Sequence, residues 1–159
     1  MTSRPTFGSL FARAIVTAGG VGYSPVAPGT CGTLVTVPIA WACRDLSTGM
    51  FLAVVAMVTI SGTLAARHAL RGWGTHDDQR IVVDEVAGYL LTVAFVDRSS
   101  GWMLAIGFGL FRLLDIKKPG PIRWIDRNVP GATGVMLDDL VAGAVGAVIM
   151  IGVAALAGC

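Results

Sequence analysis

The chain has 159 residues, a length that fits one domain with one core. Charged residues make up 14% of it, against about 25% in soluble domains. Mean hydropathy is +0.72, which makes a disordered chain or an ordinary water-soluble surface a poor fit. The net charge of +2 gives no basis for a nucleic-acid partner. We therefore expect a single membrane-embedded domain over residues 1–159.

Stretches without charged side chains indicate the helices in chain order. Residues 14–43 begin with a loop rich in glycine and proline, which leaves a short helix over 32–43 that contains Pro38. Residues 46–66 and 140–159 provide 21 and 20 uncharged positions. Since about 20 apolar residues cross the hydrocarbon core as a helix, these two stretches predict membrane-spanning helices.

Two shorter stretches lie between them, and with their flanks they predict helices over about 84–97 and 100–115. The turn at 97–101 joins them into a helical hairpin shielded by longer neighbours. The expected fold is all-α, an integral membrane helical bundle with about five membrane-embedded helices, some of them short. A fully soluble helical bundle is the alternative.

Basic residues are distributed unevenly between the two ends of these helices. If five helices alternate in direction, the loops at 44–45 and 97–98 share one side and carry two basic residues, whereas the other side carries ten. The positive-inside rule makes the second side cytoplasmic and places the C-terminus outside. Eight of the ten acidic residues also fall on the cytoplasmic side, which a solubilising surface would not require.

Two acidic pairs stand where helices are expected to begin. Asp84 and Glu85 open IVVDEVAGYLL, and Asp138 and Asp139 precede the small-residue stripe of LVAGAVGAVIM. Helix periodicity places Glu85 on a small, polar face and Asp139 above the closely packing glycines, so both are expected to face the bundle interior. The alternative role is helix capping and stabilisation of the helix dipole.

A mixed acidic and basic run, FRLLDIKKPGPIRWIDR, follows at the cytoplasmic end of the fourth expected helix. Arg112 and Asp115, three residues apart, can form an ion pair on one helix face. Lys117, Lys118 and Arg123 either attract anionic lipid at the membrane surface or hold phosphate oxygens.

A glycine-rich loop, GGVGYSPVAPGTCGTL, adds hydroxyls and free backbone N–H groups that can receive an anion. The sequence contains no GxxxxGK phosphate loop, no GxSxG elbow and no cysteine followed six positions later by arginine. Nucleotide hydrolysis and cysteine phosphatase chemistry are therefore disfavoured. Acidic clusters and a basic cluster converging on one membrane face indicate a hard-cation site beside a phosphate site.

The segments SPVAPGTCGTL, VVDEVAGYLL, FRLLDIKKPGPIRWIDR and GVMLDDLVAGAVGA together resemble the phosphatidylglycerophosphatase A family of bacterial lipid phosphatases. The resemblance implies Mg²⁺-dependent hydrolysis of phosphatidylglycerophosphate, an anionic phospholipid, to phosphatidylglycerol and inorganic phosphate. It also implies a multi-pass protein among the lipids of the bacterial inner membrane, with its active site on the cytoplasmic face.

The resemblance assigns roles residue by residue. Our hypothesis for the mechanism is that carboxylates from three helices hold one or two Mg²⁺ ions, with either a water or an aspartate as the nucleophile. The catalytic and metal-binding residues are then Asp84, Glu85, Asp115, Asp138 and Asp139. The substrate-binding residues are Thr30, Arg112, Lys117 and Lys118, to which the basic run adds Arg123.

Two other classes of protein fit the sequence less well. A divalent-cation transporter would carry charged residues deep within its helices, but residues 46–66 and 140–159 contain none. A different membrane enzyme of phospholipid headgroups, such as a CDP-alcohol phosphotransferase, would show a denser ladder of aspartates and glycines. These patterns favour a site at the membrane interface.

The charge asymmetry makes a prediction about topology. With the N-terminus cytoplasmic and an odd number of crossings, Cys159 lies outside the cell. An impermeant thiol reagent added to intact cells should therefore label Cys159, and labelling that occurs only after lysis would contradict this topology.

Overall fold

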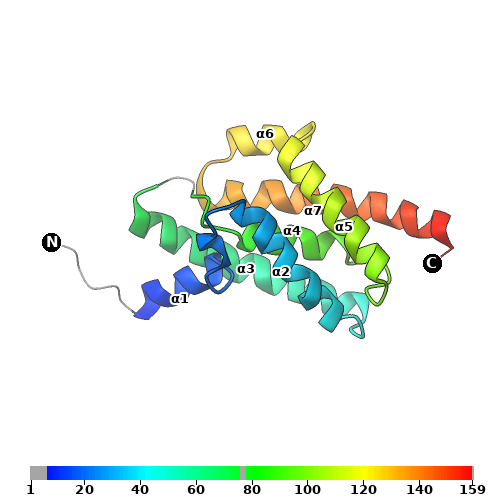
Figure 1. Ribbon diagram of the computed structural model, residues 1–159. Coiled ribbons are helices and arrows are strands. Elements are labelled where there is room, and N and C mark those ends of the chain that lie inside the picture. The colour runs from blue at the N-terminus through cyan, green and yellow to red at the C-terminus, as the bar shows by residue number, and fades with distance from the viewer. Residues whose placement is uncertain (1–6, 76–77, 159) are drawn as a thin grey trace.

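The computed structural model describes residues 7–75 and 78–158, and this part of the chain is helical without strands (Figure 1). The predicted all-α fold is confirmed. The described residues form seven α-helices and one short 3-10 helix, two α-helices more than the five helical stretches that the sequence predicted. In chain order they are α1 Phe7–Val16, η1 Val21–Tyr23, α2 Pro28–Ala42, α3 Thr48–Trp73, α4 Val83–Thr92, α5 Gly101–Lys117, α6 Pro121–Asn128 and α7 Gly131–Ala157.

Two of the described helices, α3 and α7, are long and apolar enough to cross a membrane. They have 26 and 27 residues, or roughly 40 Å at 1.5 Å per residue, whereas the hydrocarbon core is about 30 Å thick. Only 28% of the most apolar window of each helix is buried within the protein, unlike the core helix of a soluble domain. These surfaces indicate membrane association. The count of about five membrane-embedded helices is not confirmed.

Several helix boundaries differ from the prediction because charged residues lie within helices. The helix predicted over 140–159 begins nine residues earlier, at Gly131, so Asp138 and Asp139 lie two turns inside α7 and do not open it. In the same way α3 continues beyond 66 to Trp73, through Arg67 and Arg71. The length of the stretch without charged residues identified the apolar part of each helix but missed its polar first or last turns.

The shorter helices also differ from their predicted spans. The helix α2 begins at Pro28, because proline is well suited to the first turn, and it retains Pro38 inside. The helix α4 ends at Thr92, earlier than the predicted 97. Two amphipathic helices, α1 and α6, were not predicted at all.

The helices α2, α3, α4, α5 and α7 alternate in direction (Figure 1), which is the arrangement that the charge count assumed. The starts of α2, α4 and α7 and the ends of α3 and α5 lie at one end of the bundle, and the turns after α2 and α4 lie at the other end with the end of α7 (Figure 1). Ionisable residues of distant segments are thereby brought together at the first end. The assignment of that end to the cytoplasm stays a prediction.

The centre of the bundle is the short helix α4, of whose ten residues eight are buried. It packs against α2, α3, α5 and α7. The Tyr89 hydroxyl donates to the carbonyl oxygen of Leu104 at 3.0 Å, and its ring meets the Phe111 ring edge-on. The central position of α4 holds the two acidic residues of its first turn, Asp84 and Glu85, in place.

At the opposite end of the bundle, Arg98 joins the two turns. Its side chain is buried, and its guanidinium donates to the carbonyl oxygens of Ala94 at 2.9 Å and Leu46 at 2.6 Å. The same group lies 4.2 Å from the centre of the Phe51 ring. One buried cation thus links α3 to the segment that follows α4.

We predict that Arg98→Met lowers the free energy of unfolding by about 2–4 kcal/mol, because two carbonyls lose a charged donor and a cation–π contact is lost. Thermal unfolding in detergent measures the change. Arg44→Met is the control, since Arg44 is more exposed and its ion pair with Asp45 is 3.9 Å long. Equal melting temperatures for the two variants would contradict the proposed link.

Candidate functional site

A cavity of about 590 Å³ opens at the end of the bundle where α2, α4 and α7 begin and α5 ends. Backbone of the α2 start forms one wall, and the start of α7 with its preceding residues forms another. Carboxylates outnumber cations in this lining, which favours the binding of a cation. The polar and charged side chains that line it are Asp78, Gln79, Asp84, Glu85, Arg112, Asp115, Lys118, Asp126, Asp138 and Asp139.

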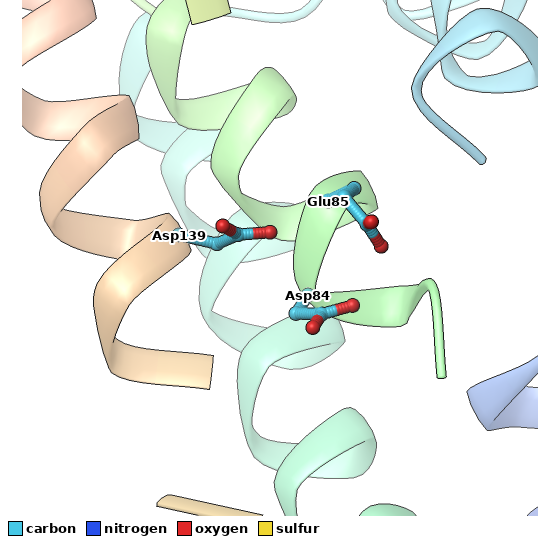
Figure 2. Close-up of side chains that lie close together, drawn as sticks. All are labelled: Asp84, Glu85 and Asp139. Carbon is cyan, nitrogen blue, oxygen red and sulfur yellow. The ribbon is translucent and has the colours of Figure 1, made fainter. Parts of the chain in front are cut away.

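Three of these carboxylates converge at the floor of the cavity. Asp84 and Glu85 belong to the first turn of α4, and Asp139 reaches toward them from α7 (Figure 2). One oxygen from each residue lies within 4.8 Å of the other two. We call these three residues the carboxylate cluster. Its oxygen donors and their spacing suit a hard divalent cation.

The carboxylate cluster is enclosed to a degree that is unusual for acidic groups. Asp84 is 7% exposed and Asp139 is 3% exposed. Oδ1 of Asp84 and Oε2 of Glu85 are buried without a hydrogen-bond partner among the described residues. Because an unpaired buried carboxylate oxygen is costly, this arrangement fits residues that receive a cation.

Burial affects the titration of the two α4 acids in the same direction. Burial, together with the nearby Glu85 carboxylate, raises the pKa of Asp84 well above its ordinary value. Burial also raises the pKa of Glu85. A divalent cation favours the ionised form of both groups and therefore opposes these shifts.

The cation Arg112 lies beside the carboxylate cluster. Its Nη1 is 2.5 Å from Oδ2 of Asp115 and 3.8 Å from Oε1 of Glu85, which confirms the predicted pair three residues apart on α5. The start of α2 packs closely here, since a Cβ on Gly29 would collide with the Glu85 carboxylate and lie 3.3 Å from Arg112 Nη1. A larger residue at position 29 would therefore require the Glu85 carboxylate to move.

A second cation, Lys118, lies on the other side of the cavity. Its Nζ is 2.5 Å from Oδ1 of Asp126 and 2.6 Å from Oδ2 of Asp138. Burial lowers the pKa of Lys118, but the hydrogen bonds to these aspartates outweigh it and leave the pKa above its ordinary value. Lys118 therefore stays charged and joins the last turn of α6 to α7.

The structure separates the predicted site residues into two groups. Three of them do not line the cavity: Thr30 lies in the first turn of α2, and Lys117 and Arg123 are exposed. The Arg123 guanidinium donates to the carbonyl oxygen of Lys117 at 3.1 Å. Their binding role stays a prediction. The cavity lining contains the other seven, Asp84, Glu85, Arg112, Asp115, Lys118, Asp138 and Asp139.

Two lining carboxylates were not among the predicted residues. Asp126 belongs to the unpredicted helix α6 and reaches the cavity through its ion pair with Lys118. Its position in the run KKPGPIRWID was the available signal, since a turn at Pro119 and Gly120 returns the chain toward Lys118. Asp78, in the connection between α3 and α4, pairs with Arg80 at 2.6 Å, and no motif marked it.

Comparisons with known proteins cover most of the chain. The family model for phosphatidylglycerophosphatase A matches residues 14–154. The Escherichia coli K12 protein named phosphatidylglycerophosphatase A is 38% identical over 131 residues, 82% of this chain and 76% of the relative. The Haemophilus influenzae protein of the same name is 34% identical over 133 residues, 83% and 81% of the two chains.

A third relative carries a different name. A Bacteroides thetaiotaomicron protein, named as a proposed phosphatidylinositol-3-phosphatase, is 40% identical over 137 residues, 81% of this chain and 84% of the relative. No solved structure matches the chain. The cavity with its seven predicted residues, the match over 14–154 and relatives above 30% identity lead to one conclusion: the chain belongs to the phosphatidylglycerophosphatase A family of phosphatase enzymes.

Proposed function

We propose that the protein is a Mg²⁺-dependent lipid phosphomonoesterase that hydrolyses phosphatidylglycerophosphate to phosphatidylglycerol and phosphate at the cytoplasmic face of the membrane. The observation that carries this proposal is the carboxylate cluster, which shares one cavity with Arg112 and Lys118 at the end of two long apolar helices. Cation ligands and phosphate ligands are thereby adjacent.

The residues present fit a magnesium ion. Asp84, Glu85 and Asp139 would hold it through carboxylate oxygens, and two of those residues have buried oxygens without a partner among the described side chains. Asp115 and Asp138 stand beside them in the lining. When bound, Mg²⁺ supplies Lewis-acid activation and neutralises charge on the phosphoryl oxygens.

The two cations of the cavity are suited to the phosphoryl group. Arg112 has a fork of N–H donors that matches phosphate oxygens, and Lys118 adds a point charge. Both are paired with carboxylates, and substrate oxygens would replace or share these carboxylates as partners. As the ester bond breaks, the two cations stabilise the charge that develops on the phosphoryl oxygens.

The cavity supplies two candidates for the nucleophile. A water can attack while a carboxylate of the lining accepts its proton, or an aspartate such as Asp139 can attack phosphorus directly. In both cases the bond between phosphorus and the glycerol oxygen breaks, and that oxygen takes a proton as phosphatidylglycerol leaves. On the aspartate route a water then hydrolyses the acyl phosphate, which releases phosphate and restores the carboxylate. The 590 Å³ cavity suits a polar headgroup, and the acyl chains would remain among the bilayer lipids that face α3 and α7.

The cytoplasmic location rests on charge. The sequence assigns ten of the twelve lysine and arginine residues to segments at the cavity end of the helices, and the positive-inside rule makes that end cytoplasmic. A site at this interface meets the headgroup of a lipid in the inner leaflet without drawing the whole lipid from the bilayer.

We predict that purified protein releases phosphate from phosphatidylglycerophosphate in the presence of Mg²⁺, and that EDTA abolishes the release, because the expected ligands are all oxygen atoms. Re-addition of Mg²⁺ in excess of EDTA should restore activity and serves as the control. Full turnover in the chelator would contradict the metal-dependent reaction.

A second substrate is favoured by one comparison. Phosphatidylinositol 3-phosphate also carries a phosphomonoester, and one relative at 40% identity is named for that lipid. The carboxylate cluster would engage the phosphoryl group common to both lipids, so parallel phosphate-release assays distinguish them. We expect a higher kcat/KM for phosphatidylglycerophosphate, and the reverse order would change the proposed substrate.

We predict that Glu85→Gln and Asp139→Asn each reduce turnover at least 100-fold, because loss of a metal ligand removes several kcal/mol of transition-state stabilisation. Asp45→Asn and Asp97→Asn, in the turns at the opposite end, should leave turnover unchanged. Melting temperature is measured alongside, since a role of Glu85 at the start of α4 alone would cost only about 1 kcal/mol of stability and no activity. Folded variants with near wild-type phosphate release would refute the site.

A further inference from the structure

A five-residue pattern occurs twice in the chain, once in each helix that supplies the carboxylate cluster. The pattern is Asp-x-Val-Ala-Gly, read as DEVAG over 84–88 and as DLVAG over 139–143. In both copies the glycine follows the aspartate by four residues and therefore lies on the same helix face, one turn further along.

The two glycines of the pattern meet where α4 and α7 pack together. A Cβ on Gly143 would collide with the carbonyl oxygen of Gly88. A Cβ on Gly88 would lie 2.6 Å from the carbonyl oxygen of Asp139 and 2.5 Å from the Phe111 ring. The two backbones are therefore in direct contact, one turn from Asp84 and beside Asp139.

The contact between the two glycine backbones sets the distance between the carboxylates of Asp84 and Asp139, because aspartate side chains are too short to adjust it. The aspartate carboxylate is separated from the backbone by a single methylene group, so the gap between α4 and α7 translates directly into the gap between Asp84 and Asp139. Both backbones lie within packed helices, so a methyl group on Gly143 requires α4 and α7 to move apart, by about 1 Å for normal van der Waals contact. A methyl group on Gly88 requires the same movement and also a shift of the Phe111 ring.

We propose that Gly88 and Gly143 are positioning residues, whose backbone contact sets the helix separation that lets the carboxylates of α4 and α7 bind one cation. This inference rests on the proposed function, since it concerns the geometry of the cation site. The repeated pattern places an aspartate and a close-packing glycine one turn apart on each of the two helices.

Other residues of α7 provide control substitutions that disturb the contact between α4 and α7 less or not at all. Gly146, about one further turn along α7, would meet the Thr92 side chain at 3.0 Å, and a side chain can yield more easily than a backbone. Gly152 on α7 has no described atom within 4 Å of an added Cβ. Met150 on α7 is fully buried away from the cavity, so Met150→Ala lowers stability without changing the helix contact.

The experiment measures Mg²⁺ binding by the full chain in detergent, through calorimetry and through the rise in melting temperature on adding Mg²⁺. We expect Gly143→Ala and Gly88→Ala to weaken Mg²⁺ binding at least 10-fold, because a misplacement of about 1 Å is large for a ligand set. Gly146→Ala should weaken it two- to five-fold. Gly152→Ala and Met150→Ala should bind Mg²⁺ as the wild type does.

The outcomes separate the inference from the proposed function. Wild-type Kd values in folded Gly143→Ala and Gly88→Ala would overturn the positioning role, as would an equal loss of binding in Met150→Ala. If neither of these two glycine variants folds, Gly146→Ala decides: a raised Kd supports the proposal and an unchanged Kd overturns it. Absence of Mg²⁺ binding by the wild-type chain would instead contradict the proposed metal site itself.

Discussion

The structure depends on the enclosure of three carboxylates at the crossing of α4 and α7. Acidic side chains are rarely buried without partners, because removing their charge from water is costly. Here Asp84, Glu85 and Asp139 are held together by helices that touch through glycine backbone, and two of their oxygens lack a donor among the described residues. A divalent cation would resolve both the repulsion and the missing partners.

The remaining helices support this crossing in different ways. The short helix α4 is surrounded by α2, α3, α5 and α7, so its acidic first turn is fixed in place. Gly29, at the start of α2, and Arg112, near the end of α5, lie on one side of the carboxylate cluster. On the other side of the cavity Lys118 forms ion pairs with Asp126 of α6 and Asp138 of α7. Apolar surfaces of α3 and α7 face outward for most of their length, which leaves the polar cavity at one end of an apolar bundle.

Sequence reasoning identified the residues of the site better than the boundaries of the fold. Acids followed by small residues on one helix face predicted that Glu85 and Asp139 point inward. Asp139 is buried as predicted, whereas Glu85 is half-buried and its neighbour Asp84 is the buried acid of α4. The start of α7 was placed nine residues too late, because only uncharged residues were counted. The aspartates Asp138 and Asp139 therefore looked like a helix boundary, although they lie inside the helix. Asp126 was missed for a different reason, since its role depends on a turn that returns α6 to Lys118, a tertiary contact without local periodicity.

We propose above all that the carboxylate cluster is the cation site of this enzyme. Crystals of the protein grown with Mn²⁺, whose anomalous scattering identifies its position, test it most directly. We expect an anomalous peak from a Mn²⁺ ion that is coordinated by oxygens of Asp84, Glu85 and Asp139. A cation bound elsewhere in the cavity, with these three side chains uncoordinated, would contradict it.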